Sequence, residues 1–250
     1  MKLLIDIGNT RLKLATLQGN SLQFVAAIPI ESADQLQRQL QVAIESLGNP
    51  ADVCVAVSVS SVQVNQAAEK AVAPKKVQWI ASSPTAAGVT NAYPDPSQLG
   101  TDRWVGMIGL TRHFATPHPP IVLASFGTAT TVDTLGPDNQ FRGGLILPGV
   151  SLMHDALANG TARLPNAVGA LAAFPTDTLS AITSGIVAAQ AGAVLRQIEL
   201  ARQAYSQQPV LCVTGGAWLL VKQEFDRLLG TNNVHELPHV VLDGLAALAG

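Results

Sequence analysis

The chain has 250 residues, of which 48% are hydrophobic and 13% charged, and its formal net charge is −2. A chain of this length can bury a sizeable core in one large domain or two smaller ones. The charge argues against nucleic acid or a membrane surface as a partner, because no basic surplus is present to neutralise phosphates. Asp6 interrupts the first apolar run, so no leader is expected, and no apolar stretch is read as a bilayer span of roughly 20 residues. We therefore expect a cytoplasmic protein.

Apolar runs rich in β-forming residues predict the strands of an α/β fold, and amphipathic segments between them predict the helices. The expected strands are Lys2–Ile5, Leu12–Leu17, Gln23–Ile28, Val53–Val59, Lys76–Ile80, Ile121–Ser125, Thr130–Thr134, Phe141–Leu147 and Val210–Thr214. The expected helices are Ala33–Ser46, Val62–Ala73, Thr101–Phe114, Val150–Asn159, Thr178–Ser206 and Trp218–Leu228. Three consecutive strands indicate a meander, and the later alternation of strands and helices indicates parallel crossovers.

The stretch DIGNTRLK, from Asp6 to Lys13, lies at a tight turn between the first two expected strands. A glycine at such a turn lets backbone amides approach an anion, and Asn9 and Thr10 add side-chain donors. A carboxylate at the end of an apolar strand is costly to bury without a partner, and a magnesium ion on nucleotide phosphates would be such a partner. The alternative is an Asp that closes an ordinary hairpin by accepting turn N–H groups.

The stretch GTDR, from Gly100 to Arg103, opens a helix after a long loop, Ser82 to Arg103, that is rich in Pro and Gly. A loop of that length inside a compact domain is usually functional. As a helix cap, Thr101 would be the N-cap and Asp102 would lie favourably at the positive end of the dipole, which leaves Arg103 without a role. As a functional site, Asp102 would accept the proton of a substrate hydroxyl and Arg103 would hold a substrate carboxylate. From the residues alone the cap is the simpler account.

The stretch LASFGTATTVD repeats the strand-turn-strand pattern of the N-terminus, with Ser125 two residues before Gly127 where the first copy has Asp6 two residues before Gly8. We therefore expect two similar halves, 1–117 and 118–250, joined by TPHPP. Two Gly-Thr turns from two halves could hold one polyphosphate. Further along, the glycine pairs in GGLILPG and VTGGAW either let backbone approach a flat ligand or allow tight strand-helix turns.

The cysteines and histidines give no metal-binding pattern. Cys54 and Cys212 each lie inside an apolar run and are expected to be buried free thiols of a reducing compartment. His235 and His239 are four residues apart, but Pro238 breaks the helix that such a metal pair would need.

Taken together, DIGNTRLK, NAYPDPSQLGTDRW, FGTATTVD, GGLILPG and VTGG resemble, in order and spacing, the motifs of type III pantothenate kinase, the family that includes the Bvg accessory factor proteins. The resemblance spans essentially the whole chain. It implies an acetate-kinase/Hsp70/actin (ASKHA) fold with two ribonuclease-H-like halves, the second of which carries a second phosphate loop, an adenosine loop and a dimer helix. It also implies transfer of the γ-phosphoryl group of ATP to pantothenate, the first step of coenzyme A synthesis.

The resemblance assigns roles to residues that match the family's motifs. It implies that Asp102 is the general base and that Asp6 serves magnesium through water. The residues implied to bind ATP and its phosphates are Asp6, Ile7, Gly8, Asn9, Thr10, Arg11, Leu12, Lys13, Gly127 and Thr128. Those implied to bind pantothenate are Tyr93, Gly100, Thr101, Asp102, Arg103 and Thr178. Thr178 would reach the substrate of the neighbouring subunit, so the active form would be a homodimer.

Ser125 departs from the family pattern, because most members have an Asp there that helps to bind the potassium or ammonium ion that their activity needs. A serine hydroxyl is a neutral and weaker ligand for a hard cation. We therefore expect a reduced or altered dependence on a monovalent cation. Two other functions stay open at this point, a kinase for another small hydroxy acceptor and a nucleotide-binding regulator with little turnover.

Overall fold

The computed structural model describes residues 1–48, 52–160, 167–230 and 234–250, and these fall into two compact units. Unit 1 contains residues 1–116, 139–141 and 239–250, and unit 2 contains residues 117–138 and 142–238. The expected division between residues 117 and 118 differs from this one at residue 117, which belongs to unit 2, and in two segments, 139–141 and 239–250, which belong to unit 1. The second segment joins unit 1 because its helix buries Leu242, Leu245 and Ala246 in the core of that unit.

Unit 1 is built on a five-stranded sheet in the order β3-β2-β1-β4-β5. Its strands are β1 (Lys2–Ile7), β2 (Arg11–Gln18), β3 (Ser21–Pro29), β4 (Val53–Ser58) and β5 (Val77–Trp79). Strands β1, β2 and β3 form the expected antiparallel meander, and β4 and β5 add in parallel. Its helices are α1 (Ala33–Glu45), α2 (Val62–Val72), α3 (Thr101–Leu110) and α7 (Val240–Leu248).

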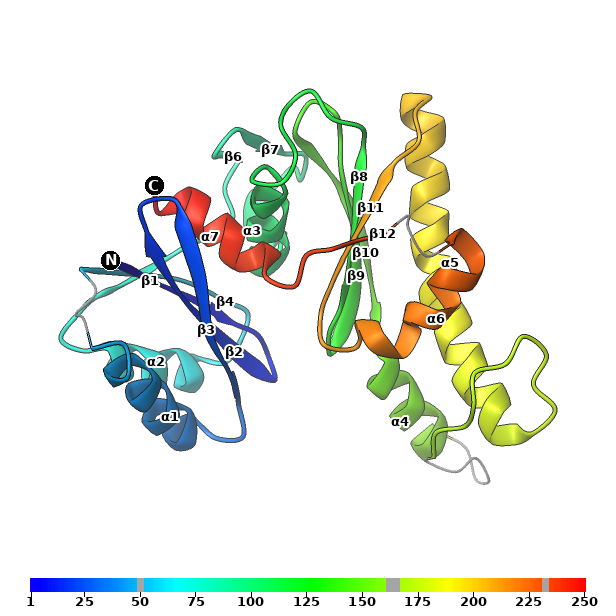
Figure 1. Ribbon diagram of the computed structural model, residues 1–250, viewed down its shortest axis with the longest axis horizontal. Coiled ribbons are helices and arrows are strands. Elements are labelled where there is room, and N and C mark those ends of the chain that lie inside the picture. Colours follow the sequence, from blue (N-terminus) through cyan, green and yellow to red (C-terminus); the bar gives the residue numbers. More distant parts are fainter. Residues whose placement is uncertain (49–51, 161–166, 231–233) are drawn as a thin grey trace. The chain divides into compact units, whose positions relative to one another are not determined.

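Apolar side chains of β1 point alternately to the two faces of this sheet, and different helices cover each face (Figure 1). Leu3, Ile5 and Ile7 of β1 face one way and pack with residues of α1 and α2. Leu4 faces the other way and packs with residues of α3 and α7. Successive side chains of a strand point to opposite faces, so Asp6 lies on the α3 and α7 side.

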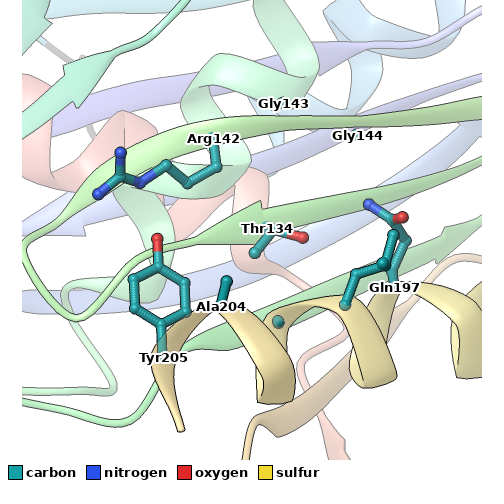
Figure 2. A pocket seen from close by; sticks show the side chains of 9 residues that line it. Thr134, Arg142, Gly143, Gly144, Gln197, Ala204 and Tyr205 are labelled. Carbon is teal, nitrogen blue, oxygen red and sulfur yellow. The ribbon is translucent and has the colours of Figure 1, made fainter.

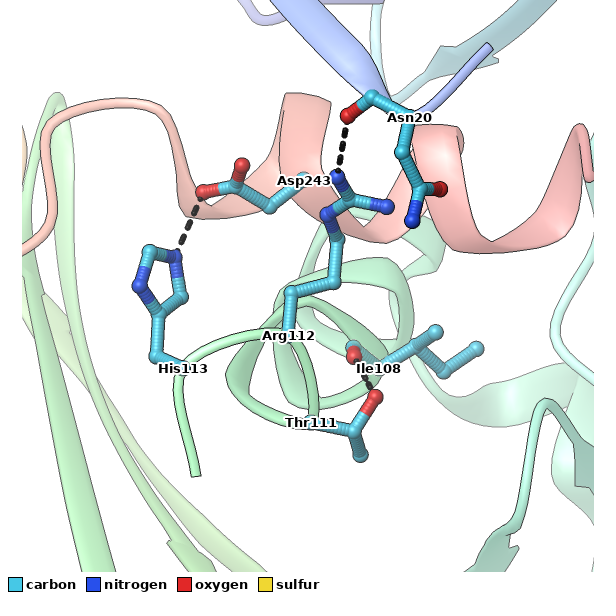
Figure 3. Close-up of polar contacts among 6 residues, drawn as sticks. All are labelled: Asn20, Ile108, Thr111, Arg112, His113 and Asp243. Carbon is cyan, nitrogen blue, oxygen red and sulfur yellow. Dashed lines mark hydrogen bonds and ion pairs between the residues drawn. The ribbon is translucent and has the colours of Figure 1, made fainter. Parts of the chain in front are cut away.

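Helices α3 and α7 approach each other closely at two glycines, where a methyl group on Gly109 would collide with the carbonyl of Val240 and one on Gly244 with that of Val105. Two polar contacts then hold the end of α3 (Figure 3). His113 Nε2 lies 2.9 Å from Asp243 Oδ2, and Arg112 donates to the carbonyl of Asn20 at 3.0 Å. The helix that begins at the GTDR motif is therefore fixed at its far end.

Unit 2 repeats the strand order of unit 1, β10-β9-β8-β11-β12, with α4 and α5 before the fourth strand and α6 after it. Its elements are β8 (Ile121–Phe126), β9 (Ala129–Leu135), β10 (Gln140–Pro148), α4 (Val150–Gly160), α5 (Thr178–Tyr205), β11 (Val210–Thr214), α6 (Trp218–Leu229) and β12 (Val234–Glu236). Strands β8 and β9 pair antiparallel, as β1 and β2 do in unit 1. Strand β11 pairs in parallel with β8 and with β12, as β4 does with β1 and β5. The internal repeat that the sequence indicates is thus present in the topology.

The core of unit 2 lies between its sheet and the helices α5 and α6. Phe126 of β8 packs against Trp218 and Phe225 of α6, with ring centroids 5.6 and 5.8 Å away. Trp218 is therefore a core residue. Both cysteines are buried free thiols, as expected, and burial raises the pKa of Cys54 and of Cys212 to about 12.

Helix α5 corrects one expectation from the sequence. By length and composition alone this 28-residue helix could cross a membrane, so the reading that no apolar stretch approaches a bilayer span was wrong. Ile186, Val187 and Val194 of α5 lie in the core of unit 2. An apolar helix of this kind is equally typical of a protein core.

The long loop between β5 and α3 contains regular structure that the sequence did not predict. It holds the short antiparallel pair β6 (Thr85–Ala86) and β7 (Val89–Asn91), followed by the 3₁₀ turn η1 (Pro96–Gln98). Strand β7 pairs in parallel with Gln140 and Phe141, the first residues of β10. This pairing brings Phe141 into unit 1.

Candidate active site

The first hairpin turn places Asp6 and Lys13 side by side. The turn has three residues, Gly8 to Thr10, and the N–H of Gly8 donates to the carbonyl of Arg11 at 3.0 Å. Asp6 and Lys13 are directly opposite in the β1–β2 register, so their side chains share one face of the sheet. The hairpin therefore places a carboxylate and an ammonium group next to a turn whose residues Asn9 and Thr10 are exposed.

Asp6 is 9% exposed, and its carboxyl is correspondingly perturbed. Burial raises the pKa of Asp6 to about 6; the Lys13 charge opposes this rise and the Asp102 charge adds to it. Asp102 lies in the first turn of α3, the helix that packs on the side of the sheet that carries Asp6. Both belong to unit 1.

The first turn of α3 is fastened to the edge of the sheet where Asp6 lies. Thr101 Oγ1 donates to the carbonyl of Ser58 at 3.0 Å. Ser58 is paired with Ile7 in the parallel β1–β4 ladder, so the contact lies at the carboxyl ends of both strands. The N-cap of α3 is Gly100, and Thr101 is its first helical residue. The reading of Thr101 as the N-cap was therefore wrong, because its hydroxyl serves a tertiary contact.

Asp102 lies in that first turn with its carboxylate folded back on the helix. Its Oδ1 accepts the backbone N–H of Arg103 at 2.8 Å. Burial raises the pKa of the Asp102 carboxyl above its ordinary value, although this hydrogen bond and the Arg103 charge act in the opposite direction. A carboxylate whose proton affinity is increased by burial is suited to accept a proton.

Arg103 is buried at 8% exposure, and its guanidinium lies beside two aromatic residues, Tyr93 and Phe141. The guanidinium carbon lies 5.7 Å from the centroid of the Phe141 ring, and Nη1 donates to the Tyr93 hydroxyl at 3.3 Å. The Tyr93 and Phe141 rings are stacked with centroids 5.7 Å apart. A buried, planar cation held in this way is a site for a carboxylate.

The second hairpin lies in unit 2. Its turn is one residue shorter than the first: only Gly127 and Thr128 separate the strands, and the N–H of Gly127 donates to the carbonyl of Ala129 at 3.1 Å. The carbonyl of Thr128 accepts the N–H of Gly149 at 3.0 Å, which ties the turn to the end of GGLILPG. Ser125 lies on β8 between Thr131 and Thr214 of the flanking strands.

Thr178 also lies in unit 2, as the first residue of α5. The Asp177 side chain caps this helix by accepting the N–H of Ser180 at 2.9 Å. Thr178 lines an apolar cavity of about 650 Å³ between α4 and α5, together with Met153, Leu157 and Ile182.

Thus unit 1 brings together Asp6, Lys13, Tyr93, Thr101, Asp102 and Arg103, whereas Ser125, Gly127, Thr128 and Thr178 lie in unit 2. The roles of Phe141 and Ser58 beside α3 were not predicted from the sequence, because no local pattern links either residue to this helix. The position of His239, whose ring stacks on Phe24 at 4.3 Å, was not predicted either. Burial and then the Lys13 charge lower the pKa of His239, against the opposing charge of Asp243.

The residues of unit 1 fit a magnesium ion that is brought with a nucleotide. Within the described residues no group of three or more His, Cys, Asp or Glu side chains could hold a metal alone. Asp6 is a buried carboxylate with a raised pKa, and a divalent cation would offset the cost of its charge. Magnesium is commonly held by one or two carboxylates, with substrate phosphates and water as its other ligands.

Comparison with known proteins identifies the family. The model of the type III pantothenate kinase family matches residues 2–200. The type III pantothenate kinase of Bordetella bronchiseptica is 44% identical over 260 residues, with 100% of this chain and 97% of the relative covered. The enzyme of the same name from Azoarcus is 39% identical over 253 residues, with 100% and 90% covered.

Solved structures with much lower identity share the fold. Component A of the (R)-2-hydroxyglutaryl-CoA dehydratase of Acidaminococcus fermentans has a TM-score of 0.55 at 13% identity, covering 99% of this chain and 95% of that chain. The activator of the 2-hydroxyisocaproyl-CoA dehydratase from Clostridium difficile, with bound ADPNP, has a TM-score of 0.53 at 13% identity, covering 99% and 92%. These likenesses, with the repeated strand order, confirm the ASKHA-type fold. On its motifs and its full-length matches, the chain belongs to the type III pantothenate kinase family.

Proposed function

We propose that this protein transfers the γ-phosphoryl group of ATP to the primary hydroxyl of pantothenate, with the residues of unit 1 as the acceptor and metal side of the site. The observation that carries the proposal is the hydrogen bond from Thr101 to the carbonyl of Ser58, which fixes the turn that carries Asp102 at the end of the sheet that carries Asp6. Two carboxylates so placed can serve the two ends of one phosphoryl transfer, one through the metal on the phosphates and the other at the attacking hydroxyl.

On the nucleotide side, the hairpin from Asp6 to Lys13 would contact the phosphates. Asp6 would hold magnesium through water, and the bound ion would neutralise charge that develops on the phosphate oxygens. Lys13 lies on the same face of the sheet as Asp6, and the turn residues Gly8 to Thr10 follow at the end of β1. In unit 2, Gly127 and Thr128 would add a second phosphate contact, since they form the equivalent turn of the repeat.

On the acceptor side, Asp102 would take the proton of the pantothenate hydroxyl. At the same time the hydroxyl oxygen would bond to the γ-phosphorus, and the bond between this phosphorus and the leaving ADP oxygen would break. Arg103 would bind the pantothenate carboxylate, and the Tyr93 hydroxyl and the Phe141 ring hold the guanidinium in position. Phosphoryl transfer demands little of the base, because positioning and charge stabilisation supply most of the catalysis. The tie between Thr101 and Ser58 supports that positioning.

We further propose that the protein depends less on potassium or ammonium than relatives that carry an Asp at the position of Ser125. Ser125 offers a neutral hydroxyl, flanked by Thr131 and Thr214 in the sheet. A hard monovalent cation binds such oxygens more weakly than a carboxylate.

We propose that the active form is a cytoplasmic homodimer in which Thr178 of one protomer reaches the substrate of the other. The apolar cavity beside Thr178 and the exposed side chains of Ile146, Leu152 and Phe174 support an interface on this part of unit 2. Phe174 is 90% exposed, which is unusual for a large apolar side chain without a partner.

The direct test is an assay of ATP consumption by the purified protein with magnesium. We expect ATP to be consumed only when pantothenate is added, with a product heavier than pantothenate by one phosphoryl group. Consumption without pantothenate would indicate another acceptor. Nucleotide binding without consumption would indicate a regulator.

A further inference from the structure

Unit 2 contains a second cavity, of about 460 Å³, which the proposed reaction does not use. It lies between strands β9 and β10 and the C-terminal half of α5 (Figure 2). Its lining includes Thr134, the second-to-last residue of β9, whereas the Gly127–Thr128 turn precedes the start of that strand. The cavity is therefore at the opposite end of β9 from the proposed phosphate contact. Its volume is in the range of small-molecule sites, about 300–1,000 Å³.

Hydrogen-bond donors dominate the polar lining. At one end the Arg142 guanidinium lies 5.8 Å from the centroid of the Tyr205 ring, and Figure 2 shows the Tyr205 hydroxyl directed from α5 toward the strands. At the other end are the Thr134 hydroxyl and the Gln197 amide. Gln197 Oε1 already accepts from Arg196 at 2.7 Å, so its Nε2 hydrogens are the groups that it presents to a ligand. Such a set of donors favours a ligand rich in acceptors.

The Arg142 charge is only partly compensated. Asp138 Oδ2 accepts from Arg142 Nη2 at 2.9 Å, but both side chains are about half exposed, and such a pair is weak. Among the described residues that line the cavity, Arg142 is the only charged one. A ligand with one negative charge suits this balance better than a dianion, which would also meet the Asp138 carboxylate.

The walls between the two ends favour a flat ligand. On the strand side the wall is the bare backbone of Gly143 and Gly144. Gly143 has a φ of +105°, and a methyl group on Gly144 would collide with Asp133. On the helix side the wall is apolar, formed by Leu200, Ala201 and Ala204. A planar group can lie between a peptide wall and a methyl-rich wall with little loss of contact.

We propose that this cavity binds a small planar organic carboxylate, with its carboxylate at Arg142 and Tyr205 and an acceptor group at Thr134 and Gln197. The site takes one class of ligand, an aromatic monocarboxylate that carries an amide or hydroxyl at the far end of its ring. The glycine pair of GGLILPG thus has a role in ligand access in addition to its role in the strand.

The test uses 4-acetamidobenzoate as the probe, with 4-methylacetanilide as a neutral analogue of the same shape. Binding is measured by calorimetric or NMR titration of the full-length protein in the presence of saturating pantothenate. A ligand of about 13 non-hydrogen atoms with ordinary efficiency binds with a Kd on the order of 1 mM. We expect such a Kd for the carboxylate and binding at least about tenfold weaker for the neutral analogue.

Two variants locate the binding, and one serves as a control. Arg142→Gln removes the charge, and Ala204→Leu fills the cavity from an exposed position of α5. Each is expected to weaken binding about tenfold or more. Arg38→Gln removes an exposed arginine of unit 1 and is expected to leave Kd unchanged. Equal Kd values for wild type and both pocket variants, loss of binding in the presence of pantothenate, or no binding at about 10 mM would overturn the proposal.

Discussion

The hydroxyl of Thr101 donates a 3.0 Å hydrogen bond to the main-chain carbonyl of Ser58. Ser58 ends β4 beside Ile7 of β1, so this bond fixes the first turn of α3 at the edge of the sheet that carries Asp6. Asp102 is the next residue of that turn. The position of Asp102, the proposed base, therefore depends on the Thr101 hydroxyl. As an N-cap, this hydroxyl would instead have accepted a backbone N–H of α3.

Replacing Thr101 tests this dependence. Thr101→Val keeps the shape but removes the donor, and we expect a loss of about 1 kcal/mol in the free energy of unfolding and a roughly tenfold lower kcat/KM for pantothenate. Thr101→Ser keeps the donor and should stay close to wild type in both quantities. The measurements are denaturant unfolding and steady-state kinetics, and equal activity of the two variants would contradict the positioning role.

The raised pKa of Asp6 predicts a pH-dependent stability difference. In the protein without nucleotide this carboxyl has a pKa of about 6, against an ordinary value of 3.8. Between these values the folded state holds a proton that the unfolded state has lost, so the Asp6 contribution to the free energy of unfolding falls as the pH rises and is lowest above about pH 6. Asp6→Asn removes the buried charge.

We therefore expect Asp6→Asn to be more stable than wild type at about pH 8, by at most on the order of 3 kcal/mol, and the difference to vanish near pH 4. Thermal unfolding without nucleotide at the two pH values measures it. Asp34→Asn, at an exposed position of α1, is the control and should show no such difference. A stability gain for Asp6→Asn that does not change with pH would refute the assignment.

Arg103 is expected to control the affinity for the acceptor. Arg103→Lys keeps the charge but loses the planar contact with Phe141 and the geometry toward Tyr93, so we expect kcat/KM for pantothenate to fall about 100-fold. Nucleotide affinity should change less than about threefold, because the proposed role of Arg103 is to bind the acceptor and not the nucleotide. Tyr93→Phe, which removes only the hydroxyl, should have a smaller effect, roughly three- to tenfold. A larger change in nucleotide affinity than in pantothenate affinity would contradict this role.

Ser125 is expected to set the response to monovalent cations. The wild-type protein should keep most of its activity when potassium is replaced by sodium, whereas Ser125→Asp should gain a clear stimulation by potassium because it adds a charged oxygen ligand. Activity measured in matched potassium and sodium buffers decides this. If the wild-type protein has negligible activity in sodium and potassium restores it, Ser125 does not weaken the dependence of activity on potassium.

Much of the fold could be predicted from the sequence, since apolar runs located all five strands of the first sheet and β8 to β11 of the second, and the glycine turns indicated the repeat. Helix α7 and strand β12 were not predicted, because β12 has only three residues and Pro238, which interrupts helices, lies just before the start of α7. The pair β6–β7 is too short for a periodic pattern. The assignment of residues 239–250 to unit 1 depends on the packing of Leu242 and Leu245, which no local pattern indicates.

The site was predictable to the extent that motifs carry it. Asp6, Asp102 and Arg103 were named from their motifs, and the structure groups them in unit 1. The surroundings that give them their properties were not predictable. Phe141 reaches Arg103 through the β7–β10 pairing. The pKa of Asp6 is raised mainly by its burial in the tertiary structure, with a smaller contribution from the charge of Asp102, 96 positions along the chain.

The central claim is that Asp102 takes the proton of the acceptor hydroxyl while taking no part in nucleotide binding. One paired measurement on Asp102→Asn tests it most directly: the rate of phosphopantothenate formation, and the Kd of a non-hydrolysable ATP analogue with magnesium. We expect the rate to fall by about 10²–10⁴-fold and the Kd to stay within about threefold of wild type. A rate within tenfold of wild type would contradict the claim, as would loss of nucleotide binding in proportion to the loss of rate.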